Sequence, residues 1–78
     1  MKHFLIVYDR PTGELREFTE FGDGEADLAL EARFERERAE RTHPEIEVVV
    51  ITSPSRAALE RTHARYFKTF RELTATEL

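Results

Sequence analysis

Two short runs of consecutive apolar residues constrain what this chain can fold into. Phe4 to Tyr8 reads FLIVY, and Val48 to Ile51 reads VVVI. Because successive side chains of a β-strand point to opposite faces, a continuous apolar run indicates a strand that is buried on both sides of its sheet. The sequence therefore predicts a sheet that is covered on both faces, by helices or by another subunit.

Turn signals divide the first half of the chain into two strands. Residues 3–9 form the first, and Pro11 and Gly13 then favour a tight turn, because proline presets φ and glycine accepts a positive φ. A returning strand follows over residues 14–21, where charged side chains are mixed with the apolar Leu15, Phe18 and Phe21. This composition is typical of an edge strand, since charge discourages further pairing.

Two helices and a third strand are predicted for the rest of the chain. Asp23 is expected to cap a helix that ends near Arg41, and Ser53 followed by Pro54 is expected to open a second helix that reaches about Leu73. The third strand lies between them, over residues 45–52. In the first helix, the residues expected to share the packing face are Ala26, Ala29, Leu30 and Phe34; in the second they are Leu59, His63, Tyr66, Phe67, Phe70 and Leu73.

The order strand, strand, helix, strand, helix predicts an α+β domain, ββαβα, with a three-stranded antiparallel sheet in the order 2-1-3. A right-handed crossover through the first helix brings the third strand to the far side of the first. We expect one domain over residues 1–78, with residues 74–78 as a frayed tail. If both helices lie on one face, the other face stays exposed and predicts an interface.

The small size of the chain favours association. A chain of 78 residues buries only about 60% of the surface that its unfolded form exposes. Since there is no cysteine, disulfides and thiolate metal sites cannot help. We therefore expect a homodimer, and the interface candidates are Phe4, Ile6, Tyr8, Val49, Ile51, Glu37 and Arg41.

The sequence contains no motif that assigns catalysis or a cofactor. His63 lies within the apolar stripe of the second helix, where a structural histidine is the first interpretation and a general base or metal ligand the second. Asp9 ends the first strand, where its carboxylate can accept hydrogen bonds from turn amides. No cofactor or metal is expected for the favoured function, and a metal-dependent hydrolase that uses Asp9 or His63 is a distant alternative.

Leu5 to Asp9, an apolar strand that ends in Tyr-Asp, resembles the start of the small CRISPR-associated endonucleases. That family would use the aspartate near a divalent metal in a dimer. It would also place a helix directly after the first strand, whereas Pro11 to Gly13 here predict a turn into a second strand.

A row of basic residues on the second helix offers a second kind of surface, made of Arg61, Arg65, Lys68 and Arg71. Such a row can follow the phosphates of a nucleic acid. The net charge of −4 opposes nonspecific attraction to nucleic acid or to anionic lipid. The apolar runs are far shorter than the ~20 residues that span a bilayer, so we expect no membrane segment and a cytoplasmic location. The favoured function is a non-enzymatic interaction or regulatory module, and nucleic-acid binding is the alternative.

Overall fold

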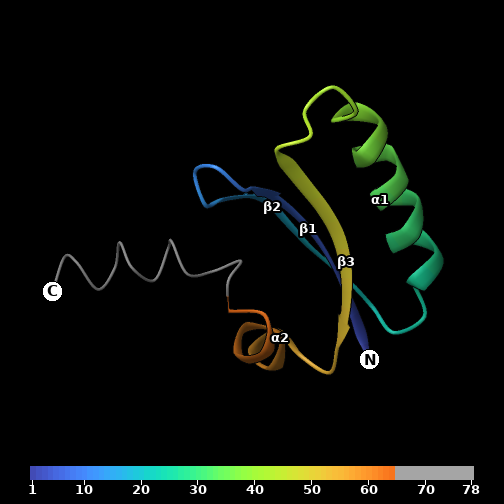
Figure 1. Ribbon diagram of the computed structural model, residues 1–78. Helices are drawn as coiled ribbons and strands as arrows, with labels where there is room; N and C mark the ends of the chain where they lie inside the picture. Colours follow the sequence, from blue (N-terminus) through green and yellow to red (C-terminus); the bar gives the residue numbers. More distant parts are fainter. Residues whose placement is uncertain (65–78) are drawn as a thin grey trace, which may run out of the picture.

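The computed structural model describes residues 1–64 as three strands and two helices (Figure 1). The first hairpin consists of β1 (Lys2–Asp9) and β2 (Glu14–Phe21). Helix α1 (Ala26–Ala39) follows, then β3 (Ile46–Ser53) and helix α2 (Arg56–Thr62). None of the helices within residues 1–64 is long and apolar enough to cross a membrane.

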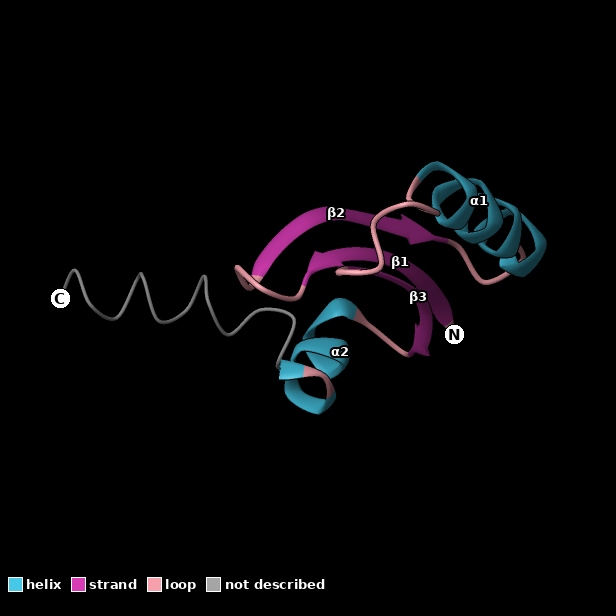
Figure 2. Ribbon diagram, turned by 45° about the horizontal axis from the view of Figure 1, so that its top comes forward, coloured by secondary structure: helices cyan, strands magenta, loops and turns pink. Residues whose placement is uncertain are grey.

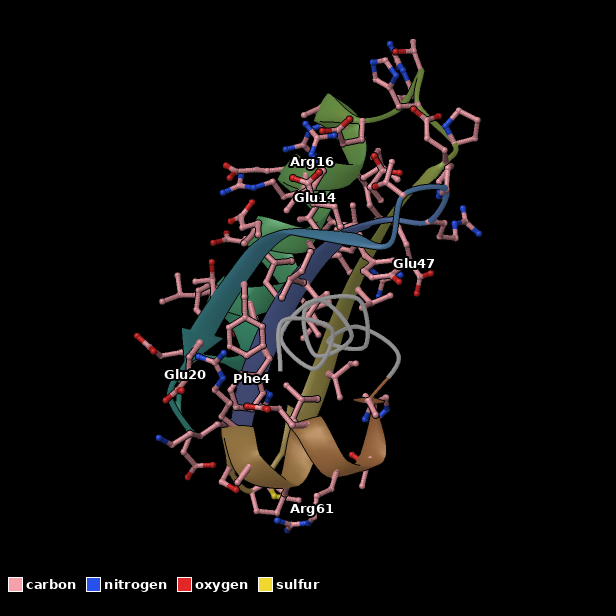
Figure 3. All side chains as sticks on the ribbon, turned by 90° about the vertical axis from the view of Figure 1, so that its left-hand side faces the viewer. Phe4, Glu14, Arg16, Glu20, Glu47 and Arg61 are labelled. Atoms are coloured by element: carbon pink, nitrogen blue, oxygen red, sulfur yellow. The ribbon has the colours of Figure 1, made fainter. Side chains whose placement is uncertain are left out.

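The sheet confirms the predicted α+β topology. Its order is β2-β1-β3, and β1 pairs antiparallel with both neighbours. The pairing of β1 with β3 is continuous, whereas the pairing with β2 shifts register between Val7 and Tyr8 and leaves Arg16 as the extra residue of a bulge. The connection from β2 through α1 to β3 is a right-handed crossover (Figures 1 and 3).

The two helices lie on opposite faces of the sheet, α1 on one side and α2 on the other (Figure 2). Four residues of the FLIVY run are buried as predicted, since Phe4, Leu5, Ile6 and Val7 are at most 4% exposed, whereas Tyr8 is half-buried. Phe4 and Ile6 pack against Leu59 of α2, and the ring of Phe4 lies 5.4 Å from that of Phe18. Neither face of the sheet is left wholly uncovered, so the expectation of a partner requires other support.

Only one residue of the predicted packing face of α1 is buried against the sheet. Ala29 is fully buried, but Leu30 and Phe34 are 43% and 51% exposed. The small side chain of Ala29 lets the helix approach the sheet, and Arg36, seven residues later on the same face, extends to Glu17 of β2. The predicted packing face is therefore wrong except at Ala29.

The predicted caps are also shifted. Asp23 binds the N-terminal ammonium at 2.9 Å instead of capping α1, whose N-cap is Glu25. Helix α2 is capped by the hydroxyl of Ser55, which accepts a hydrogen bond from the amide of Ala58 at 3.1 Å. Ser53 is the last residue of β3, and its hydroxyl donates to the carbonyl of Ser55.

Helix α2 ends earlier than predicted. Its last residue is Thr62, whose hydroxyl donates to the carbonyl of Ala58 at 3.0 Å, and His63 is the C-cap. A threonine hydroxyl that bonds to the preceding turn weakens or bends a helix. The rest of the predicted stripe, Tyr66 to Leu73, and the predicted tail, residues 74–78, lie outside the described residues.

The turn between β1 and β2 depends on Gly13. Its φ is 75°, and its amide donates to the carbonyl of Asp9 at 2.8 Å. We expect Gly13→Ala to lower the free energy of unfolding by about 1–2 kcal/mol, because a Cβ strains this left-handed conformation. Gly24→Ala is the matched control: a Cβ added there would meet no atom within 4 Å and the φ of Gly24 is not positive, so this substitution should change stability by less than about 0.5 kcal/mol. Urea unfolding measures both variants, and equal losses would contradict the role given to Gly13.

Candidate interaction surface

Helix α1 presents an apolar stripe to solvent. Leu30, Phe34 and Glu37 follow one another along the helix at intervals of three or four residues, and all three are exposed. We call the two apolar residues of this row, Leu30 and Phe34, the Leu30 stripe. Glu37 forms an ion pair with Arg33 at 3.5 Å, and the exposed Arg41 follows just after the helix. Leu30 and Phe34 belong, with Met1 and Leu28, to the exposed large hydrophobic side chains of residues 1–64.

The face of the sheet that carries α2 is partly covered. Its fully buried centre is Phe4, Ile6 and Leu59, and the half-buried residues around that centre are Tyr8, Leu15, Phe18, Val49 and Ile51. The guanidinium of Arg56 lies 4.7 Å from the centroid of the Phe18 ring and is paired with Glu60 at 3.1 Å. This cation–π contact shields the outer part of the face from water.

The structure separates the predicted interface residues into three groups. Phe4 and Ile6 are fully buried inside the protomer and present no surface. Tyr8, Val49 and Ile51 are half-buried on the α2 face. Glu37 and Arg41 are exposed on and after α1, on the other face.

Asp9 and His63 are not brought together. Asp9 lies at the end of β1 that pairs with Ile46, whereas α2 begins after Ser53, which pairs with Lys2 at the opposite end of the sheet. The carboxylate of Asp9 accepts a hydrogen bond from the amide of Thr12 at 3.4 Å, as expected for a turn residue. The imidazole Nδ1 of half-buried His63 lies 2.9 Å from the hydroxyl of Thr62. Within residues 1–64, no three His, Asp or Glu side chains gather as a metal site would require.

Only part of the basic row can be located. Arg61 is exposed in the last turn of α2. Arg65, Lys68 and Arg71 lie outside the described residues.

An ion pair that sequence reasoning missed ties α1 to the sheet. The guanidinium of Arg36 donates to both carboxylate oxygens of Glu17, at 2.7 Å and 3.1 Å. The hydrogen bond from Arg36 holds the pKa of Glu17 below its ordinary value, and the charge of Arg36 acts in the same direction. Two half-buried arginines, Arg33 and Arg36, lie on the helix face that Ala29 defines. The sequence did not indicate which of them would reach a carboxylate on the sheet, or on which strand.

The lowered pKa of Glu17 gives a pH dependence with a defined sign. The unfolded chain binds the proton more tightly, so the pair stabilises the fold fully above pH 4.5 and progressively less as the pH falls through the pKa of the folded state. We expect Glu17→Gln to lower the urea midpoint at pH 7. The difference in midpoint between this variant and the unmodified protein should shrink as the pH falls below 4.5. Glu31→Gln, on the exposed side of α1, is the control. A difference for Glu17→Gln that is constant with pH would contradict this account.

Comparisons with known proteins add no relative: no family model, curated protein or solved structure matches the chain.

Proposed function

We propose that this protein is a small non-enzymatic interaction or regulatory module that acts as a homodimer. The observation that carries the proposal is the Leu30 stripe, because two large apolar side chains, Leu30 and Phe34, face solvent on a domain that buries few residues of this size. Covering them would supply stability that a chain of 78 residues has difficulty supplying alone. The proposal includes a cytoplasmic location, for which the cysteine-free sequence gives indirect support.

The mass of the full chain in solution tests the homodimer. Sedimentation equilibrium between about 1 and 100 µM should give a species of twice the 9.2 kDa chain mass, with dissociation on dilution. A mass of 9.2 kDa throughout this range would contradict the homodimer. The interaction role would then require a different protein partner.

Nucleic-acid binding through the basic residues is the rival proposal, and the exposed Arg61 is its only described member. An electrophoretic mobility shift with a mixed-sequence oligonucleotide, at low and high salt, separates the two. Binding that weakens steeply with salt and is abolished in Arg61→Glu/Arg65→Glu/Lys68→Glu would favour the rival, because phosphate contacts release counterions. A shift that these charge reversals leave unchanged would eliminate it.

A further inference from the structure

The two edges of the sheet are built differently. The outer strand β2 contains Glu14, Arg16, Glu17 and Glu20, and Arg16 is the extra residue of its bulge. Charges and bulges are devices that keep an edge strand from pairing with another chain. The β2 edge is therefore protected against association.

The β3 edge has none of these protections between Val48 and Thr52. These five residues are all β-branched and uncharged, and their pairing with β1 is regular along its whole length. No other strand within residues 1–64 pairs with the outer side of this segment, which forms the open edge of the sheet in Figure 3. A long, regular, apolar edge of this kind is a template for another strand.

Burial falls from the centre of the sheet to this edge. The valine and isoleucine side chains of Val48 to Ile51 are all half-buried, although α1 covers one face of the sheet and α2 the other. Their counterparts on β1, from Phe4 to Val7, are at most 4% exposed. The apolar surface that remains open therefore lies along β3.

The Leu30 stripe lies on the same side of the molecule as the β3 edge. At about 100° per residue, Leu30 and Leu28 flank the buried Ala29 in opposite directions. Because both the α-helix and the crossover from β2 to β3 are right-handed, Leu30 and Phe34 project toward the β3 side and Leu28 toward the β2 side. Two apolar surfaces, one on the helix and one on the strand, thus lie on the same side of the protomer.

We infer that β3 pairs antiparallel with β3 of a second copy, which joins two three-stranded sheets into one continuous six-stranded sheet. This inference rests on the proposed homodimer and specifies its interface. A twofold axis perpendicular to the sheet at Val50 makes the pairing self-complementary and sets each residue of Val48 to Ile51 opposite an uncharged residue of the second copy. An axis at Val49 would instead set Ile51 opposite Glu47.

The same axis brings the two α1 helices together. Strands are spaced about 4.8 Å apart, and α1 lies over β1 and β3. The two α1 axes then lie about 10 Å apart, a normal packing distance for helices. Leu30 and Phe34 of each copy become buried between them, which accounts for their exposure in the single protomer.

Disulfide cross-linking of single-cysteine variants tests the register. The chain has no cysteine, so Val48→Cys, Val49→Cys, Val50→Cys and Ile51→Cys each introduce one thiol, and Glu20→Cys places the control on the β2 edge. A residue on the twofold axis faces its own copy at about 4.5–5.5 Å between Cα atoms, within the disulfide range, whereas its neighbours along the strand lie beyond that range. After oxidation with glutathione at equal protein concentration, we expect a sharp maximum of covalent dimer at one of the four β3 positions. The yield of covalent dimer at that position should exceed the yield of Glu20→Cys at least tenfold.

The outcomes separate this inference from the proposal on which it rests. Each variant is first shown to be folded by circular dichroism, and exchange of valine or isoleucine for cysteine is a small change in volume. If the unmodified chain has the mass of a dimer but no β3 position exceeds Glu20→Cys, β3 pairing is wrong and the homodimer stands. If the unmodified chain is a monomer at 100 µM, both are wrong.

Discussion

Replacing Phe4 by alanine is expected to lower the free energy of unfolding by about 3–5 kcal/mol, the range for removing a large aromatic side chain from a core. Phe4 is fully buried on the central strand, where it contacts Leu59 of α2 and the ring of Phe18. Its loss therefore leaves a cavity shared by two strands and a helix. The free energy of unfolding of a domain of this size is only about 5–10 kcal/mol, so Phe4→Ala should be close to unfolded at 37 °C.

Phe34→Ala is the matched control, because it makes the same substitution on a side chain that is 51% exposed. In urea unfolding at low protein concentration, where any dimer is dissociated, we expect a change below about 1 kcal/mol. Similar losses for the two variants would mean that Phe34 is as important to the protomer core as Phe4. That result would contradict the orientation of α1.

The second large effect concerns association. We expect the double variant Leu30→Ala/Phe34→Ala to weaken dimerisation at least tenfold. Truncating apolar residues at the centre of an interface lowers the binding free energy by about 2 kcal/mol or more. Sedimentation equilibrium as a function of concentration measures the dissociation constant. The secondary structure should be unchanged, since both side chains are exposed in the protomer.

Leu28→Ala controls for the general loss of apolar surface. Leu28 is 50% exposed on the same helix, but it projects toward β2 and away from the β3 edge. Its substitution should change the dissociation constant less than twofold. If Leu28→Ala weakens the dimer as much as the double variant, the interface is not on the β3 side of α1.

The strands and their order could be predicted from the sequence because each depends on local signals. Pro11 and Gly13 specify the first turn, and the two-sided apolar run from Phe4 to Tyr8 specifies the central strand. The bounds of β1, β2 and β3 agree with expectation to within one residue.

The orientation of α1 could not be predicted because its apolar and packing faces differ. The pattern suggested burial of Leu30 and Phe34, whereas Ala29 is the residue that contacts the sheet and Arg36 reaches Glu17. Which face of α1 packs on the sheet depends on the side chains of the strands beneath it. The spacing of apolar residues within the helix carries no information about those side chains. If the β3 edge is paired, the exposed Leu30 and Phe34 become part of a core that only two chains complete.

The predicted caps were wrong for a related reason. Asp23 and Ser53 are both good capping residues, but each has another role: Asp23 makes a long-range contact, and Ser53 belongs to the sheet. The N-terminal ammonium binds Asp23, and the β3 pairing extends to Ser53, so Ser55 is left to cap α2. Neither the contact of Asp23 with the N-terminus nor the extension of β3 to Ser53 can be predicted from the neighbouring residues in the sequence.

Amide hydrogen exchange along β3 tests the central claim most directly and needs no substitution. In a single protomer, successive amides of an edge strand point alternately toward β1 and toward solvent, so protection should alternate from Val48 to Thr52. In the paired sheet every one of these amides is hydrogen-bonded. At 100 µM we predict continuous protection from Val48 to Thr52, which reverts to alternation on dilution; alternating protection in a sample that has the mass of a dimer would contradict pairing through β3.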